Sequence, residues 1–119
     1  MTTIADPDIA LLDDLRARLG PQGMVEGEAM RPWLEEPRGK WQGRAACALR
    51  PADTAQVAEI VTRCGEAGVG IIPWGGGTGL VSGQIAQSGP LPVILSLDRM
   101  DRIRRVNPED DAMTVEAGC

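Results

Sequence analysis

The stretch AACALRPADTAQVAEIVTRCGEAGVGIIPWGGGTG, residues 45–79, decides the fold of this chain. It reads as two short apolar strands, at 45–49 and 69–72, which are separated by an amphipathic helix and followed by a glycine-rich turn. Short connections in a strand–helix–strand unit favour parallel pairing of the two strands through a right-handed crossover. We therefore predict a βαβ unit at 45–74 within a mixed α/β (α+β) fold.

The helix inside this unit has a recognisable start, face and end. Asp53 or Thr54 can cap its first turn, because a side-chain oxygen there accepts a free backbone N–H. Gly65 and Gly68 surround its end, and Pro73 closes the strand that follows. The predicted buried face consists of Val57, Ile60, Val61 and Cys64.

Another amphipathic helix is expected upstream, near residues 7–19. Asp6 is its expected N-cap, Pro7 fits the first helical position, and Gly20-Pro21 ends it. Its apolar positions at helical spacing are Leu11, Leu12, Leu15 and Leu19. Residues 21–44 have no clean period, so we predict an irregular loop with charged and aromatic anchors there.

Further strands follow the glycine-rich turn. Residues 93–97 form the first, and 103–106 and 112–117 read as two more around the turn-forming spacer 107–111. The charged side chains of the short turn before this pair are expected to be solvated, namely Asp98, Arg99, Asp101 and Arg102.

Composition and charge argue against several classes of function. The net charge is −5 and no cluster of Lys and Arg occurs, which argues against nucleic-acid binding. No apolar run approaches the ~20 residues that span a bilayer, and the N-terminus lacks the features of a secretory signal. We therefore predict a cytoplasmic protein without a transmembrane segment.

The chain contains no histidine, so it offers no histidine base, histidine metal ligand or histidyl-flavin link. Its cysteines, Cys47, Cys64 and Cys119, are odd in number and far apart. This pattern favours reduced, buried thiols over a disulfide or a metal site. We predict no bound metal.

The segment Gly75-Gly76-Gly77-Thr78-Gly79 is the strongest functional signal. Glycine permits positive φ and lets a ligand approach the backbone, and successive N–H groups form an anion nest to which Thr78 adds a hydroxyl donor. The spacing fits neither the Walker A loop, which needs a lysine after its last glycine, nor the G-x-G-x-x-G pattern. We interpret the segment as a diphosphate-binding turn, and a tight turn that binds nothing is the alternative.

Several pieces of the sequence also carry a family resemblance. In chain order they are RGKWQGRA at 38–45, Arg50-Pro51, PWGGGTGL at 73–80, LSLDRMDRI at 95–103 and TVEAGC at 114–119. Together they resemble an FAD-binding domain of the vanillyl-alcohol oxidase / p-cresol methylhydroxylase type, in particular the branch of D-lactate, glycolate and D-2-hydroxyglutarate dehydrogenases. We accordingly divide the chain into an N-terminal helix with a connecting segment, 1–44, and the first part of that domain, 45–119.

The resemblance implies that FAD is the cofactor and that the loop binds its pyrophosphate through backbone N–H groups. The implied cofactor-binding residues are Pro73, Trp74, Gly75, Gly76, Gly77, Thr78, Gly79 and Leu80. Packing in the core is the expected role of the Trp74 ring. Three upstream cations are expected to be surface charges rather than ligands of an anion, namely Arg38, Lys40 and Arg44.

The implied activity is the oxidation of a small D-2-hydroxy acid to a 2-oxo acid, with the catalytic and substrate-binding groups in a later domain. No catalytic residue is assigned within this chain, and the electron acceptor is not specified. Two alternatives stay open: a sugar-alcohol or aldonolactone oxidase of the same superfamily, and a truncated, non-catalytic fragment. Because the chain stops at Gly118-Cys119, directly after a strand, we expect a longer complete protein and an inactive isolated segment.

Overall fold

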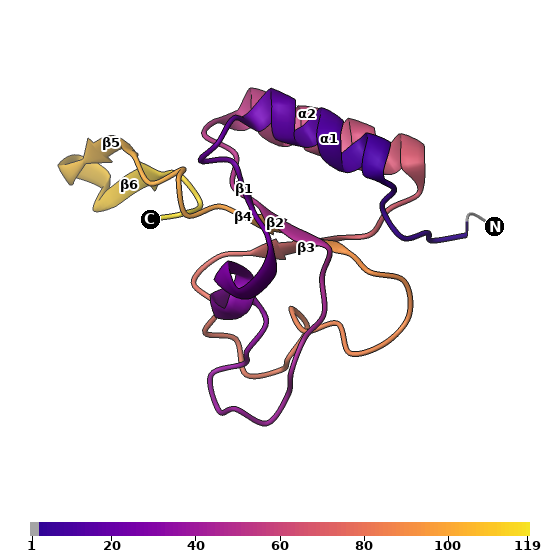
Figure 1. Cartoon of the computed structure of the whole chain (residues 1–119). Coiled ribbons are helices and arrows are strands. Elements are labelled where there is room, and N and C mark those ends of the chain that lie inside the picture. The colour runs from indigo at the N-terminus through magenta and orange to yellow at the C-terminus, as the bar shows by residue number, and fades with distance from the viewer. Residues whose placement is uncertain (1–2) are drawn as a thin grey trace.

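A four-stranded sheet forms the centre of the chain, with two helices on one face and a two-stranded hairpin that extends away from it (Figure 1). The computed structural model describes residues 3–119. The elements in chain order are α1 (Ile9–Leu19), β1 (Met24–Val25), η1 (Gly27–Trp33), β2 (Cys47–Leu49), α2 (Thr54–Ala67), β3 (Ile71–Trp74), β4 (Val93–Ser96), β5 (Ile103–Asn107), η2 (Pro108–Asp110) and β6 (Ala112–Val115). The mixed α/β class is therefore confirmed, and the long loops lie with η1 on the side opposite the helices (Figure 1).

Strand β4 lies inside the sheet, whose order is β1-β2-β4-β3. Ile94 of β4 is in register with Ala48 of β2 and with Ile72 of β3, and both pairings are parallel. The predicted parallel direction of β2 and β3 is confirmed, but their direct pairing is wrong because β4 lies between them. The inner position buries both faces of this apolar strand. Strand β3 takes the edge, where Pro73 is tolerated despite its missing N–H.

Helix α1 begins two residues later than predicted. Asp8 is the N-cap, and its carboxylate accepts a hydrogen bond from the Leu11 N–H at 2.8 Å. Asp6 is not the cap, because its carboxylate accepts from the Leu91 N–H instead. The predicted end is confirmed, since Gly20 has φ 74° and follows the last helical residue.

Helix α2 has the predicted cap and end. The Asp53 carboxylate accepts from the Gln56 N–H at 2.9 Å, and Gly68 closes the helix in the left-handed conformation. Ile60 and Cys64 are buried as predicted, whereas Val61 is 50% exposed. Val61 follows Ile60 by one position, which is about 100° around the helix, and so points away from the core.

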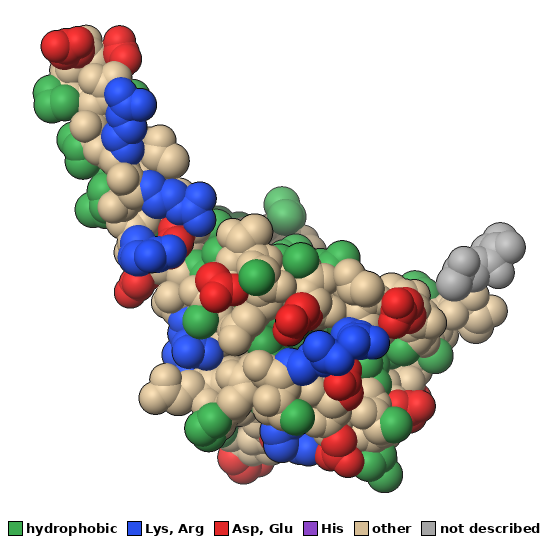
Figure 2. All heavy atoms as spheres, turned by 90° about the horizontal axis from the view of Figure 1, so that it is seen from above, with side chains coloured by type: hydrophobic (Ala, Val, Ile, Leu, Met, Phe, Trp, Pro, Cys, Tyr) green, Lys and Arg blue, Asp and Glu red, His purple; other side chains and the backbone are tan. Residues whose placement is uncertain are grey.

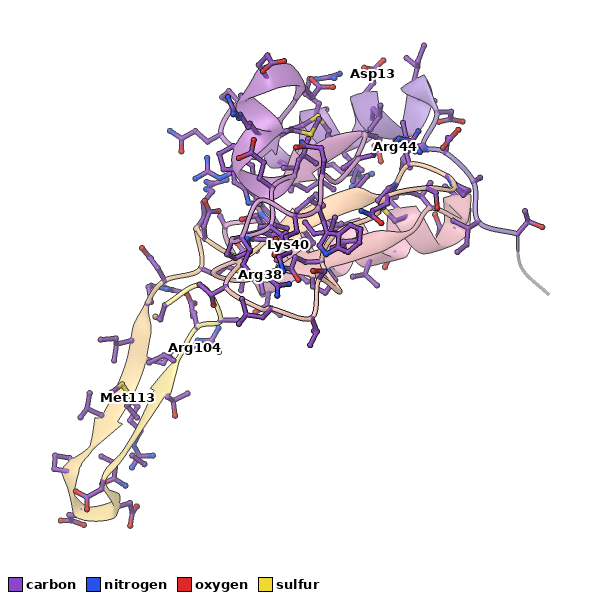
Figure 3. All side chains as sticks on the ribbon, turned by 90° about the horizontal axis from the view of Figure 1, so that it is seen from below. Asp13, Arg38, Lys40, Arg44, Arg104 and Met113 are labelled. Atoms are coloured by element: carbon purple, nitrogen blue, oxygen red, sulfur yellow. The ribbon has the colours of Figure 1, made fainter. Side chains whose placement is uncertain are left out.

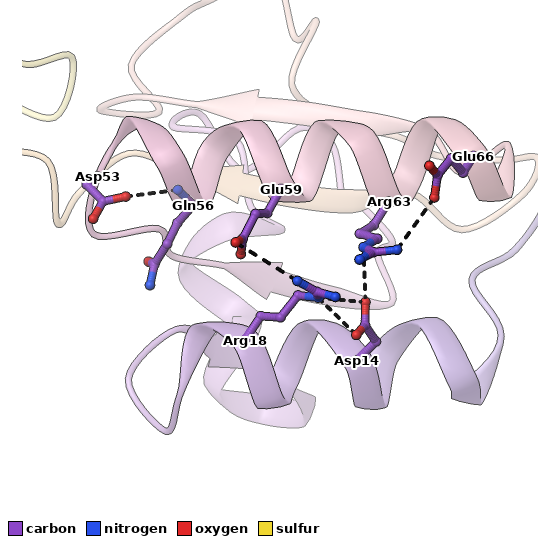
Figure 4. Close-up of polar contacts among 7 residues, drawn as sticks. All are labelled: Asp14, Arg18, Asp53, Gln56, Glu59, Arg63 and Glu66. Carbon is purple, nitrogen blue, oxygen red and sulfur yellow. Dashed lines mark hydrogen bonds and ion pairs between the residues drawn. The ribbon is translucent and has the colours of Figure 1, made fainter.

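The two helices lie side by side and share a network of ion pairs (Figure 4). Arg18 of α1 contacts Glu59 of α2 at 4.0 Å, and Arg63 of α2 contacts Asp14 of α1 at 3.5 Å. These side chains are between a third and a half exposed, so each pair contributes little to stability. The apolar side chains of α1 that are buried in the core stabilise its position more than these ion pairs do. They are Leu11, Leu15 and Leu19.

Residues 21–44 are more ordered than the predicted irregular loop. Strand β1 pairs antiparallel with β2, and η1 is a 3₁₀ helix of seven residues that buries Met30. The Arg50 N–H also donates to the carbonyl of Gly23 at 2.7 Å. A strand of two residues is too short to show a period of two, which explains why the sequence pattern did not reveal it.

The cysteines differ in their surroundings. Cys47 and Cys64 are buried and free, as predicted, whereas Cys119 is exposed, so that part of the prediction is wrong. Cys119 comes after β6, the last strand, and lies outside the core. Burial raises the pKa of the Cys47 thiol to about 12, which keeps it protonated and unreactive. Within residues 3–119 no group of ligating side chains could hold a metal ion, and no helix of that range is long and apolar enough to cross a membrane.

The hairpin of β5 and β6 has one apolar and one polar face. Val106 lies opposite Met113, and Ile103 lies opposite Val115, with an irregularity in register between Ile103 and Arg105. These four apolar side chains are between 42% and 64% exposed. The arm carries blue cationic side chains along one side and green apolar ones along the other (Figure 2). A two-stranded hairpin is marginal alone, so contacts at its base matter.

Glu116 fastens the base of this hairpin. Its side chain is almost fully buried and accepts hydrogen bonds from the Arg102 backbone N–H at 3.1 Å, from Arg102 Nη2 at 2.9 Å and from Arg104 Nη2 at 3.3 Å. These bonds, above all those from Arg102, lower the pKa of Glu116 to about 2.

Three of the charged side chains in the 98–102 turn, which the sequence predicts to be solvated, also form hydrogen bonds or ion pairs. Arg102 binds Glu116, and Asp98 accepts from Arg50 Nε at 3.1 Å. Arg99 donates to the carbonyl of Arg50 at 2.9 Å. Asp98 and Arg102 are exposed as predicted, and the sequence did not reveal their pairing because the partners lie far away along the chain.

Replacing Glu116 by Gln should lower the melting temperature, because a neutral amide cannot balance two guanidinium groups. In the parent, the carboxylate contributes fully above its ordinary pKa of 4.5, and the contribution is lost as the pH falls toward 2. Thermal unfolding of both proteins from about pH 7 downward checks this, and the two melting temperatures should converge in acid. Glu109→Gln, at the hairpin tip, is the matched control. Equal melting temperatures of E116Q and parent at neutral pH would show that the contact is dispensable.

Candidate cofactor-binding loop

The glycine-rich loop leaves the carboxyl end of β3, next to the carboxyl end of β4. Trp74, the last residue of β3, is in register with Ser96, the last residue of β4. In open α/β sheets, ligands bind outside the carboxyl ends of the strands. No helix begins between residues 75 and 92, so the loop is an irregular turn, as the spacing of its glycines indicated.

The loop lines a shallow hollow of about 260 Å³. Its lining residues are Pro73, Trp74, Gly75, Gly76, Gly77, Thr78, Gly79 and Gln84. Among the described residues, no acceptor takes a hydrogen bond from the N–H groups of residues 75–79. The protein itself leaves these donors unused, as a backbone nest for an anion requires.

The structure brings together seven of the eight residues that the sequence proposed for this site. The exception is Leu80, which is 59% exposed and lines a neighbouring hollow together with Arg38 and Trp41. Gln84 was missed by sequence reasoning. Its amide Nε2 donates to the carbonyl of Gly79 at 3.2 Å, and no sequence pattern marks it within the polar stretch that follows the loop.

Gly77 is required by the protein itself. It has φ +70°, and a Cβ built on it would lie 2.6 Å from the indole ring of Trp74. That ring is buried, which confirms that Trp74 packs in the core rather than standing in solvent. The loop is thus folded directly over the indole, and only glycine fits the contact.

At Gly75 and Gly76 an added Cβ atom would not clash with the protein. A Cβ on Gly75 would have no atom within 4 Å, and one on Gly76 would meet only the methyl group of Thr78 at 3.9 Å. Nothing in the described chain requires glycine there. The bare backbone at these two positions fits a ligand that approaches closely, so the loop passes this test as a phosphate cradle.

The hollow contains no ionisable side chain, so its donors are N–H groups, one hydroxyl and one amide. The upstream cations Arg38, Lys40 and Arg44 are exposed, as predicted. Figure 3 shows Arg38 and Lys40 close together on the side of the molecule away from the helices. Arg38 nevertheless touches the end of the loop, since its Nη2 donates to the carbonyl of Leu80 at 2.9 Å. The hollow offers hydrogen-bond donors for an anion but no ionisable side chain for proton transfer.

Comparison with known proteins gives a consistent picture. A model of the FAD binding domain family matches residues 45–119. The chain is 35% identical over 106 residues to a probable mitochondrial D-2-hydroxyglutarate dehydrogenase of Oryza sativa subsp. indica, covering 85% of the chain and 18% of that protein. It is 33% identical over 125 residues to the mitochondrial D-2-hydroxyglutarate dehydrogenase of Bos taurus, covering 99% and 21%. The chain thus spans about a fifth of the length of these relatives.

Solved structures share the fold at lower identity. The 4-ethylphenol oxidase of Gulosibacter chungangensis superposes with a TM-score of 0.77 at 21% identity, over 98% of this chain and 24% of that one. A p-cresol methylhydroxylase gives 0.69 at 20% identity, over 98% and 24%. The resemblance to this type of domain, predicted from short sequence pieces, is therefore confirmed at the level of the fold.

Gly77→Ala should destabilise the chain, whereas Gly76→Ala should not. The left-handed backbone at position 77 costs a non-glycine residue about 1–2 kcal/mol, and the contact with the Trp74 indole adds to this. Gly76→Ala should change the free energy of unfolding by less than about 0.5 kcal/mol. Urea denaturation followed by tryptophan fluorescence measures both. Equal stability of the two variants would contradict the packing of the loop on Trp74.

Proposed function

We propose, starting from the fact that this chain belongs to the FAD binding domain family, that residues 73–80 hold the pyrophosphate of FAD. The observation that carries the proposal is the run of free N–H groups at Gly75 and Gly76, where no protein atom fills the place of a side chain. This run lies at the carboxyl end of two parallel strands, where such ligands bind.

Backbone dipoles have to supply the attraction for the anion. The chain carries a net charge of −5, and no cation lines the hollow. Hydrogen bonds to a charged acceptor are shorter and stronger than neutral ones, so several N–H groups acting together can hold a diphosphate. The Thr78 hydroxyl and the Gln84 amide lie in the same lining and supply further donors.

For the complete protein we propose the oxidation of a D-2-hydroxy acid to a 2-oxo acid. Relatives named D-2-hydroxyglutarate dehydrogenase, D-lactate dehydrogenase and glycolate oxidase subunit support this substrate class. Bound FAD supplies the hydride acceptor of such a reaction. The described lining of the loop hollow contributes the anchor of the cofactor and no ionisable side chain, so the groups that orient the substrate belong to other residues.

Two other readings remain alternatives. A sugar-alcohol or aldonolactone oxidase of the same superfamily would use the same loop, and a non-catalytic fragment would keep it without turnover. The electron acceptor is not specified. Several relatives are named as mitochondrial proteins, so the cytoplasmic location predicted from the sequence is not confirmed.

Gly76→Val should abolish or strongly weaken FAD binding while leaving the chain folded, because the new side chain points into space that only a ligand would occupy. Thr78→Val keeps the shape and removes one hydroxyl donor. A hydrogen bond to a charged group is worth about 1.5–3 kcal/mol, so its loss should weaken binding roughly tenfold to a hundredfold. Titration of FAD fluorescence with each variant measures the dissociation constants.

Gly65→Val is the matched control for the glycine substitution. Gly65 lies in helix α2, and a Cβ there also meets no atom within 4 Å. This variant should bind FAD like the parent. If Gly76→Val stays folded and binds FAD as tightly as the parent, the loop is a structural turn and the proposal fails.

The FAD-loaded chain of 119 residues should not oxidise hydroxy acids. No described side chain in the loop hollow can take a proton or orient a carboxylate. The flavin absorbance should therefore stay unchanged when D-2-hydroxyglutarate, D-lactate, glycolate or an aldonolactone is added without oxygen. Bleaching by one of these compounds would place catalytic groups within this chain, and its identity would decide between the substrate classes.

A further inference from the structure

The turn at residues 36–40 is organised around one buried carboxylate. The Glu36 side chain has no solvent exposure and accepts a hydrogen bond from the Lys40 N–H at 2.8 Å and from Arg38 Nε at 3.2 Å. The Gly39 N–H closes the turn on the Glu36 carbonyl at 2.9 Å. Burial opposes ionisation of Glu36, but these hydrogen bonds outweigh it and lower its pKa. The carboxylate is therefore a fixed, charged anchor for Arg38.

Arg38 connects the Glu36 carboxylate to the end of the glycine-rich loop. While Nε binds Glu36, Nη2 of the same guanidinium donates to the carbonyl of Leu80 at 2.9 Å. These two partners lie more than 40 residues apart in the sequence. A planar guanidinium binds two acceptors in a fixed relation, which a flexible ammonium cannot do. Leu80 is the first residue after Gly79, so the contact acts on the exit of the loop.

A second contact fastens the same two segments a few residues further on. The Arg44 N–H donates to the carbonyl of Ala86 at 2.8 Å. Between the two contacts, Ser82 has φ 60°, a conformation that costs energy for a residue other than glycine and persists only where the surroundings impose it. The Ile85 N–H closes this stretch on the Ser82 carbonyl at 3.1 Å. The stretch after the loop is thus held from the 36–44 segment at both ends.

We propose that Arg38 is a positioning residue for the cofactor loop: it ties the loop exit at Leu80 to the buried carboxylate of Glu36 and so presets the N–H groups of residues 75–79. This inference rests on the proposed FAD binding by the loop. It also revises the sequence-based interpretation of Arg38 as a plain surface charge. The residue touches protein rather than ligand, so its effect on FAD passes through the geometry of the loop.

The test compares Arg38→Gln with Arg38→Lys and with Arg31→Gln. Arg31 is a matched control, since it is an exposed arginine paired with Glu35 at 2.7 Å and does not line the loop hollow. Two quantities are measured on each full chain: the FAD dissociation constant, and hydrogen exchange of the Arg44 and Ile85 amides without ligand. Thermal unfolding accompanies both, because Arg38→Gln leaves the buried Glu36 carboxylate without its cationic partner, and this measurement separates a general loss of stability from a local change in the loop.

We expect Arg38→Gln to speed exchange of both amides and to weaken FAD binding, each by about three- to tenfold, since the guanidinium bonds to Glu36 and to the Leu80 carbonyl are lost at a partly exposed site. Arg38→Lys should restore part of both effects, and Arg31→Gln should match the parent. Faster exchange with unchanged FAD affinity would overturn the role in cofactor binding, and unchanged exchange would overturn the contact itself. If even the parent binds no FAD, the proposed function fails, while exchange still decides whether Arg38 holds the loop.

Discussion

The parallel pairing of β4 with both β2 and β3 is the interaction on which the rest of the structure depends. Ile94, which is 1% exposed, stands opposite Ala48 on one side and Ile72 on the other. Burying this strand on both faces requires cover from both sides. Helices α1 and α2 cover one face of the sheet, and η1 with the long loops covers the other face (Figure 1). The carboxyl ends of β3 and β4 are thereby held next to each other, and the glycine-rich loop starts from that fixed edge.

The glycines of the loop have two different structural roles. Gly77 is needed because it rests on the buried indole of Trp74 in a left-handed conformation. Gly75 and Gly76 have no structural need to lack a side chain, and they leave the backbone open to an anion. Gly77 fixes the loop against the indole, and Gly75 and Gly76 leave its backbone accessible. The proposed binding of a diphosphate needs both features, because donors that are already in place lose little entropy when the ligand arrives.

Two buried carboxylates connect parts of the chain that local structure leaves separate. Glu116 fastens the β5–β6 hairpin through Arg102 and Arg104, and Glu36 anchors Arg38 against the exit of the loop. In both places the carboxylate is enclosed while its guanidinium partners remain partly exposed. The hydrogen bonds lower the pKa of each carboxyl group, so both stay ionised at neutral pH. Acid therefore weakens the hairpin base and the loop support together.

The sequence by itself determined the elements that depend on neighbouring residues. The cap at Asp53, the left-handed end at Gly68 and the apolar run of β4 are local features, and the four glycines of residues 75–79 predict an anion-binding turn. Only the tertiary structure decided the insertion of β4 between β2 and β3, the pairing of Glu116 and the contact of Arg38 with Leu80. These contacts connect residues that lie far apart along the chain. A contact of this kind leaves no periodic pattern or fixed spacing in the sequence from which it could be predicted.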